Sequence, residues 1–567
     1  MSWITESEKY ANSPEALVEI QFDPESEGDL RKYACEYVRP TDDTPYKGNV
    51  LGLPRIYQSV GDIRRSFEMS RIEVVFSDAD YEFRTLIDTQ GIKNVDVLIR
   101  VSFVNESLAT QSLVLFTGKL YDWEVLDGLR FKVICEQNLP NIDNFYPSKR
   151  VELTDYPNCH STAPGWIIPI PYGEISSIGL SAKGAYGHPS LGSGGAGTGL
   201  PFIDDTVDSE QHLVGLQTGA ITVATVYKNG VAQTAGVGND YQISTQVIDG
   251  FTHTEIHWEA GNRPTETDLI SADISFLDGG QPWGPVDAIH NFLTNFVGWV
   301  SFNAAALAAA QTLEATRSYR FDGVLWEAKK TLRTILDDWR SEIELDIFAN
   351  KDGEIVFKYL SALFAAPNEY SDVLNILQPF ESRTMVEELL NRLKYGYNFN
   401  YSQSYYYNYS TRNDVDSQTK HGGIYEGEFQ GFRWIRNAAM ATDITARKIM
   451  RFKNPPVFVN LPFPLKTFTE DLADVVGVSH FQGDSADGYV NKRFQIRATD
   501  YDLDRYVNTM LLEDVSAFIG QACLLGDETV LPATWPLAVG AQRDYCYLCN
   551  DATGKFSDGE PGKRLYD

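Results

Sequence analysis

Alternating hydrophobic and polar residues dominate the first 155 positions of the chain. The alternation has a period of two, and it recurs at 16–22, 70–78, 96–104, 112–125 and 129–136. Successive side chains of a strand point to opposite faces, so this pattern predicts half-buried strands. The tripeptide Leu126-Asp127-Gly128 is typical of a hairpin turn between the last two strands. The region is therefore expected to form an antiparallel barrel or sandwich.

A second β-rich region is predicted at 210–278. Its short strand-like stretches end at Asn229-Gly230, Asp249-Gly250 and Asp278-Gly279, dipeptides that favour tight turns. The preceding segment, 182–202, is rich in Gly and Ser and is expected to be a linker or an exposed loop. A phosphate cradle is disfavoured there, because no strand enters the segment, no helix leaves it and no GK[ST] follows.

The pattern becomes helical between 285 and 345. Pro285 stands near an expected helix start, and 291–310 is expected to form a buried helix pair. A 3.6-residue period predicts a further helix, with one face formed by Leu325, Leu332, Ile335, Leu336 and Trp339. Asp352-Gly353 then indicates a hairpin, so this part is expected to be a small α+β unit.

Strand patterns return in the last third of the chain. A strand with a Tyr-rich continuation is expected at 389–414, and a helix at about 437–452 is followed by the helix-breaking pair Pro455-Pro456. Further antiparallel strands are expected at 472–481 and 492–514. The sequence predicts a multidomain, mainly β protein with α+β segments.

Prolines interrupt one apolar stretch, STAPGWIIPIPYGEI at 161–175. Proline has no backbone N–H to donate to a sheet ladder. Pro169 and Pro171 therefore predict a sheet edge, a bulge or an extended segment lying on another surface, and not a core strand. The stretch is expected to close the first β domain.

The net charge of −30, without a long basic cluster, disfavours tight binding to phosphate backbones. An acidic surface would still suit a channel through which nucleic acid slides without sticking. No run of about 18 uncharged apolar residues predicts a membrane helix. The N-terminal residues have no secretory-signal pattern, so a chain made in the cytoplasm is expected.

The sequence contains no strong catalytic pattern. HExxH and GxSxG are absent. Carboxylates are abundant, but the distance between two carboxylates that would identify a glycosidase pair cannot be obtained from the sequence. His253 and His257 lie four apart in a strand-like segment, where solvated side chains are expected instead of metal ligands. We therefore predict that the protein is not an enzyme, with no catalytic, cofactor-binding or metal-binding residue.

Two motifs keep alternative interpretations open. Cys546 and Cys549 form a C-x-x-C with Cys523 upstream, but three thiols fall short of the four ligands of a structural zinc or iron–sulfur site, and YCYLC also alternates like a strand. The Tyr-rich run at 401–410 fits either a glycan- or base-stacking platform or a half-exposed hairpin, and basic residues for nucleic-acid binding are absent from it.

The order of elements, together with Tyr156-Pro157 and Ile-Pro-Ile-Pro-Tyr-Gly at 168–173, resembles the tail-tip (baseplate) hub proteins of long-tailed bacteriophages, prophages and gene-transfer particles. Val-Tyr-x-x-Gly at 226–230, the helices, the x-Asp-Gly-x hairpin and the late strand set match the same family. Iron–sulfur ligation is known at some phage tail tips, so the resemblance favours the interpretation of the three cysteines as cluster ligands.

The resemblance implies two tube-like antiparallel β-barrel domains, a small β insertion and a helical or α+β domain. The expected boundaries are 1–180 for the barrel ending in the proline motif, 181–284 for the insertion, 285–380 for the α+β domain, 381–520 for the second tube-like domain and 521–567 for a C-terminal docking segment.

The implied function is that of a structural virion protein at the tail tip. A homotrimer would join the hexameric tail tube to a threefold tip or fibre and form part of the DNA ejection channel. The implied partners are the tail tube or distal tail protein, other tail-tip and central fibre proteins, the tape-measure protein and transiently passing DNA. A receptor- or glycan-binding tail protein is the alternative, followed by a carboxylate-dependent cell-wall hydrolase.

Overall fold

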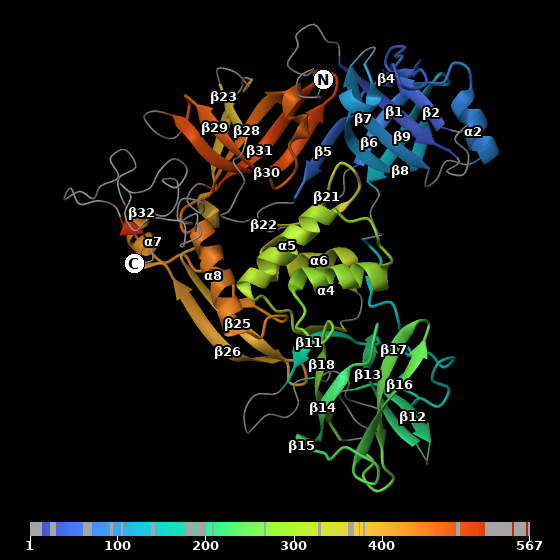
Figure 1. Ribbon diagram of the computed structural model, residues 1–567, viewed down its shortest axis with the longest axis vertical. Helices are drawn as coiled ribbons and strands as arrows, with labels where there is room; N and C mark the ends of the chain where they lie inside the picture. Colours follow the sequence, from blue (N-terminus) through green and yellow to red (C-terminus); the bar gives the residue numbers. More distant parts are fainter. Residues whose placement is uncertain are drawn as a thin grey trace.

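The computed structural model describes residues 14–22, 30–60, 71–90, 95–103, 106–137, 142–176, 186, 200–206, 209–265, 268–326, 330–360, 368–372, 375–377, 380–483 and 488–515, with 547–548 and 563–564. Strands make up 47% of the described residues and helices 18%, which confirms the mainly β fold. Figure 1 shows two β bodies side by side at one end, a helical layer in the middle and a further β body at the other end.

The N-terminal body is a nearly closed barrel. Its strands are β1 (Pro14–Gln21), β2 (Leu30–Ala34), β3 (Lys47–Gly48), β4 (Val50–Gly52), β6 (Arg71–Ser77), β7 (Asp96–Phe103), β8 (Leu113–Val125) and β9 (Arg130–Gln137). The sheet order is β3-β2-β1-β7-β8-β9-β6-β4. Only Asn49 separates β3 from β4, so the two ends of the sheet meet through a single residue of chain. The five strands expected from alternation are all present.

Aromatic side chains fill the barrel beneath helix α2 (Glu82–Gln90). Phe83 of α2 lies 4.7 Å from Phe76 and 5.1 Å from Phe131, measured between ring centroids, and all three are buried. The helix therefore closes one side of the barrel by adding an aromatic ring to its core. A second helix, α3 (Leu108–Gln111), connects β7 to β8.

Two sheets form the body at the opposite end. One contains β11 (Ile170–Ile175), β14 (Thr222–Lys228), β15 (Val231–Ala232), β18 (Ile270–Phe276) and β19 (Gly323–Leu325); the other contains β12 (Phe202–Thr206), β13 (Ser209–Gln217), β16 (Tyr241–Ile248) and β17 (Phe251–Trp258). Asn229-Gly230 and Asp249-Gly250 form their turns with positive φ at both residues. The strands expected at 210–278 are thus present, and β11, β12 and β19 from outside that range complete the two sheets.

The proline motif does not form the expected sheet edge. β11 lies between β18 and β19, and it changes partner along its length: Tyr172 pairs with β19, whereas Gly173 pairs with β18. Each half of the strand therefore needs ladder bonds on one side only, so Pro171 is tolerated inside a buried strand. The Pro171 carbonyl accepts a hydrogen bond from Nε2 of Gln217 at 2.7 Å.

The helical layer begins at Pro285, as expected. It contains α4 (Pro285–Phe292), the π-helical turn η2 (Leu293–Val297), α5 (Ala304–Arg317) and α6 (Leu332–Ile343), followed by the hairpin of β21 (Leu345–Ala349) and β22 (Ile355–Tyr359); β10 (Phe145–Tyr146) pairs with β20 (Lys330–Thr331) beside it. Two expectations are wrong. Leu325 lies in β19 instead of on the α6 face, and only Ala310 and Glu314 of α5 are buried.

The second of the paired β bodies contains β23 (Glu369–Ser371), β24 (Glu381–Thr384), β28 (Val457–Pro464), β29 (Val475–His480), β30 (Tyr489–Asp502) and β31 (Val507–Asp514), with the 3₁₀ turn η4 (Leu465–Thr469). β5 (Arg55–Ser59), from the N-terminal part, pairs with β30. The same part of the chain contains β25 (Arg392–Asn400), β26 (Tyr405–Asn413), β27 (Gln430–Gly431), α7 (Val415–Lys420), α8 (Ala438–Phe452) and the 3₁₀ turn η3 (Val386–Glu388). Buried residues of β25 and α8 pack into the core of the helical layer. The helix expected at 437–452 is α8, with Asn437 as its N-cap.

Candidate functional site

The barrel and the second sheet are joined by one short strand. β5 continues directly from β4 of the barrel and pairs antiparallel with β30, so that Tyr57 lies opposite Asp500. The backbone N–H of Val60 donates to the carbonyl of Arg497 at 3.0 Å. Arg55 forms an ion pair with Asp502 at 3.1 Å. Figure 1 shows β5 in the space between the two bodies.

The two bodies also share apolar core. Ile56 of β5, Phe468 of η4, and Tyr501 and Leu503 from the end of β30 belong to the same buried cluster as the barrel interior. The rings of Phe468 and Tyr501 lie 5.0 Å apart, measured between centroids. Because the joint combines ladder hydrogen bonds with a continuous core, the two bodies are held as one rigid pair.

A network of buried ion pairs connects the second sheet to α8 and β21. Arg451 of α8 donates from Nε to Oε1 of Glu513 at 2.7 Å, and Arg497 lies 3.3 Å from Asp346 and 3.5 Å from Glu513. Burial alone would raise the pKa of Glu513, but the two guanidinium groups outweigh that effect and hold the pKa below its ordinary value. The network links α8, β21, β30 and β31 through paired charges.

The barrel and the second sheet repeat one strand order. β6, β7, β8 and β9 are arranged as β7-β8-β9-β6, and β28, β29, β30 and β31 are arranged as β29-β30-β31-β28. A helical segment follows the first strand in both cases, namely α2 and η4. The outer strands differ, since β1 is antiparallel to β7 whereas β23 is parallel to β29. The shared four-strand unit is an internal repeat.

The repeat extends to individual backbone bonds. The N–H of Leu120 in β8 donates to the carbonyl of Val95, and the N–H of Ile496 in β30 donates to the carbonyl of Asp474, both at 2.8 Å. A bulge follows each residue, against β9 in one case and β31 in the other. Leu120 and Ile496 are therefore equivalent positions, which fixes the residue-by-residue match of the two long strands.

A groove of about 660 Å³ runs over the face of the second sheet that is turned away from its core. β5, β24, β28, β30 and β31 all contribute to its walls. Phe458 and Leu511 give the groove an apolar floor, and Asp500 and Arg383 add charge. Burial raises the pKa of Asp500, and Arg55 partly offsets this effect. The groove offers mixed polar and apolar contacts to a partner surface.

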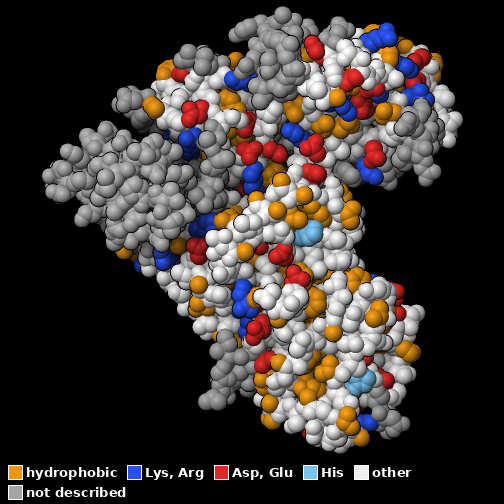
Figure 2. Space-filling model, viewed as in Figure 1, with side chains coloured by type: hydrophobic (Ala, Val, Ile, Leu, Met, Phe, Trp, Pro, Cys, Tyr) orange, Lys and Arg blue, Asp and Glu red, His pale blue; other side chains and the backbone are white. Residues whose placement is uncertain are grey.

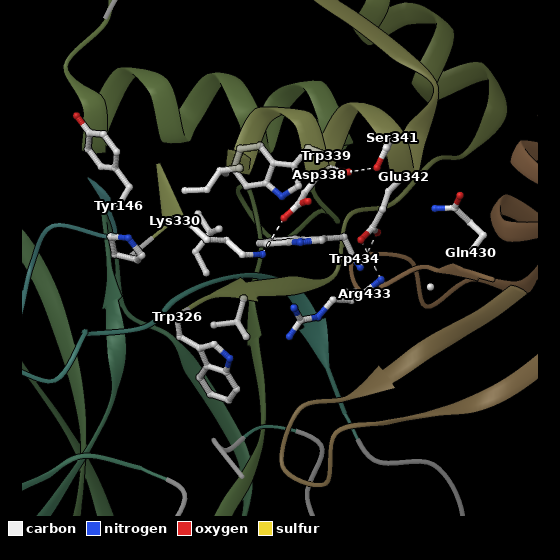
Figure 3. A pocket seen from close by; sticks show the side chains of 15 residues that line it. Tyr146, Trp326, Lys330, Asp338, Trp339, Ser341, Glu342, Gln430, Arg433 and Trp434 are labelled. Atoms are coloured by element: carbon white, nitrogen blue, oxygen red, sulfur yellow. Dashed lines mark hydrogen bonds and ion pairs between the residues drawn. The ribbon is translucent and has the colours of Figure 1, made fainter. Parts of the chain in front are cut away.

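A smaller pocket of about 220 Å³ lies beneath α6, where three tryptophans converge (Figure 3). Glu342 accepts backbone hydrogen bonds from Arg433 at 3.1 Å and Trp434 at 3.0 Å. Burial raises the pKa of Glu342 to about 8, and those two hydrogen bonds act against this effect. Lys330 and Asp338 form an ion pair of 2.7 Å in the same pocket. Since Glu342 is engaged by backbone donors, it fixes the 433–434 loop under α6.

The Tyr-rich run forms a half-exposed hairpin from β25 and β26, as one interpretation expected. Its tyrosines do not share a single stacking surface: Tyr405 contacts Tyr407, with centroids 5.0 Å apart, whereas Tyr406 contacts Phe399 and Phe429 at 4.9 and 5.8 Å. Tyr405 is 37% exposed. A flat platform of three adjacent rings is therefore not present at 405–407.

The two histidines expected on one strand face, His253 and His257, differ in burial. His253 is buried, and its Nδ1 lies 2.5 Å from the hydroxyl of Tyr156, so the expectation that it is solvated is wrong. Burial lowers its pKa. His257 is half-buried and bonds to Ser244. Within the described residues, no three His, Cys, Asp or Glu side chains gather as metal ligands.

Cys523, Cys546 and Cys549 lie outside the described residues, so the C-x-x-C interpretation stays a prediction. The sequence reasoning did not identify β5 as a strand of the distant sheet. The alternation of buried Ile56 with exposed Tyr57 was the available signal, but it carries no information about the partner strand. None of the helices in the described part of the chain combines the length and apolar character that a membrane crossing requires.

No protein-family model and no curated protein matches the chain. Solved structures do match. The 43 kDa tail protein of prophage MuSo2 from Shewanella oneidensis is 10% identical, with a TM-score of 0.40, over 89% of this chain and 99% of that one. Three of the matching structures are tail proteins. A tail protein from Neisseria meningitidis is 7% identical, with a TM-score of 0.39, over 89% of this chain and 99% of its own.

The prophage tail protein gp18 from Listeria monocytogenes is 8% identical, with a TM-score of 0.36, over 88% of this chain and 95% of its own. With TM-scores of 0.40 or lower, these similarities are too loose to define a fold family.

Proposed function

We propose that this chain is a structural tail protein, the subunit of a trimeric tail-tip hub that joins the hexameric tail tube to a threefold tip or fibre. One observation carries the proposal: two β bodies with the same four-strand order are fixed side by side by β5. Three such chains present six similar units in a ring. A ring of this kind matches sixfold symmetry on one side and threefold symmetry on the other.

The position of the other elements supports the same arrangement. The paired β bodies lie together at one end of the molecule, and the helical layer and the two-sheet body extend away from them (Figure 1). A ring built from the paired bodies would therefore leave these parts free to contact other tail-tip and fibre proteins. The tail tube or distal tail protein and the tape-measure protein are the partners proposed on the ring side.

The charge of the chain supports a role in the ejection channel. The net charge is −30, and on the face shown in Figure 2 the basic side chains of the described residues are interspersed with acidic ones. Such a surface gives DNA few sites for counterion release, so DNA would pass without tight binding. The proposed role is structural, at the tail tip of the virion, and includes no catalytic step.

Imaging of intact particles by electron cryomicroscopy tests this proposal. The expected result is three copies of this chain around the tail axis, at the tip end of the tube. A chain absent from the tail tip, or present there in a number other than three, would disprove the hub assignment. Particles that carry a tag on this chain provide the control for its position.

A further inference from the structure

One half of β8 is exposed where the equivalent half of β30 is covered. Beyond the bulge, positions 122–125 correspond to 498–501, because both stretches follow an equivalent residue and pair with β9 or β31 in the same register. β5 covers the β30 side, and Thr499 and Tyr501 there are 0% and 2% exposed. Their counterparts in β8, Trp123 and Val125, are 38% and 40% exposed.

Backbone N–H groups in this half of β8 point to the side that no strand covers. Leu126 donates its N–H to the carbonyl of Arg130, toward β9. Alternate residues of a strand direct their N–H groups to opposite sides, so the N–H groups of Val125 and Trp123 point away from β9. Trp123 N–H bonds to Oδ1 of the neighbouring Asp122 at 2.9 Å, a local substitute for a ladder partner. Within the described chain, no strand pairs with this side of β8 beyond the bulge.

Exposed apolar side chains alternate with the acidic side chains of Asp122 and Glu124 along the open ladder. Tyr121 is 55% exposed, and Leu126 and Leu129 at the hairpin tip are 39% and 57% exposed. Proteins normally cover or charge such an edge, because unpaired backbone groups flanked by apolar side chains attract another strand. The chain's own β5 already pairs with β30, so the same strand is not available to β8.

We propose that the outer half of β8, residues 121–125, is the docking edge for a second copy of this chain, which adds a strand to β8 as β5 adds one to β30. The joint inside one chain is the template for the contact between chains, because both would connect the same repeated unit to its neighbour. Head-to-tail contacts of this kind close into a ring when the rotation allows it. The inference rests on the proposed hub assembly and names the surface that builds it.

Sedimentation equilibrium of the full chain tests the proposal with two variants. Val125→Pro removes an N–H that points to the open side and leaves the β9 ladder intact, so the fold is expected to be retained. Val125→Lys places a charge at the same edge without a backbone change. Both are expected to weaken self-association at least about tenfold. Val247→Lys, at an exposed valine of edge strand β16, is the matched control and is expected to associate like the wild type.

Wild-type association retained in both Val125 variants would overturn the proposal, and Val125→Lys alone decides the test if Val125→Pro does not fold. A wild-type chain that stays monomeric at every concentration also overturns it. If hydrogen exchange then shows protected amides at Trp123 and Val125, the chain itself covers the edge. The hub function is tested separately, by the position and number of copies of this chain in imaged particles. If particles contain a threefold hub but the Val125 variants associate normally, the proposed function is retained and the proposed docking edge is refuted.

Discussion

The guanidinium group of Arg340 donates from Nη2 to the carbonyl oxygen of Val60 at 2.6 Å, across 280 positions of the sequence. Arg340 belongs to α6 and is fully buried, and Val60 follows the last residue of β5. The contact anchors the strand that joins the two β bodies to the helical layer. One buried side chain thus contacts the joint between the two β bodies from the helical layer and contributes to the relative position of all three parts.

Replacement of Arg340 by Met is expected to lower the free energy of unfolding by about 2–3 kcal/mol, because the Val60 carbonyl loses a charged donor. Urea denaturation measures this change. Arg383→Met is the matched control: Arg383 forms only a surface ion pair with Glu387, and its side chain is 72% exposed. Its effect should stay within about 0.5 kcal/mol. Equal effects of the two substitutions would contradict the anchoring role of Arg340.

Glu513→Gln is expected to destabilise the fold by about 3–5 kcal/mol, since it removes the buried carboxylate that Arg451 and Arg497 share. The folded-state pKa of Glu513 is lowered, so its contribution is present above the unfolded pKa and is lost as the pH falls through the folded pKa. The variant should therefore lose part of the acid sensitivity of the wild type. Denaturation curves across acidic pH measure this, and Glu426→Gln, at the partly exposed pair with Lys394, is the control.

Glu342 should make stability fall as the pH rises. Its folded pKa of about 8 lies above the unfolded value of 4.5, so the folded chain holds more protons between these two values. The contribution is complete below the unfolded pKa and is lost as the pH rises through the folded pKa. Glu342→Gln should flatten this decline. Melting temperatures from pH 5 to 9 test the prediction, and an unchanged slope in the variant would refute it.

Gly173→Ala tests the partner switch in the proline motif. Gly173 has φ +73°, and an added Cβ would lie 2.3 Å from the backbone oxygen of Phe321. We expect a loss of more than about 3 kcal/mol in unfolding free energy. Gly128→Ala is the control, because Gly128 also has a positive φ but has nothing within 4 Å of the added Cβ. Backbone strain alone should lower its stability by about 1–2 kcal/mol.

The sequence alone determined most local elements. Period-two alternation placed five of the eight strands of the first barrel. Turn dipeptides placed the hairpins at Gly128, Gly230 and Gly353, all of which have positive φ. The helix at 437–452 was expected from the sequence pattern that ends at Pro455-Pro456, and it begins after Asn437. These signals are local, because each depends on which face of one strand or helix is buried.

Tertiary structure alone decided which elements meet. β5 lies more than 400 positions from β30, and no periodicity in either segment encodes that pairing. The sequence likewise does not encode the switch of β11 from β19 to β18, which allows Pro171 to lie inside a sheet. It also does not encode the burial that raises the pKa of Glu342. β8 and β30 occupy equivalent positions in the repeated unit, yet the outer half of β30 is covered by β5 and that of β8 is exposed. A sequence pattern specifies a face, whereas the neighbour that covers the face is specified by the packing of the whole chain.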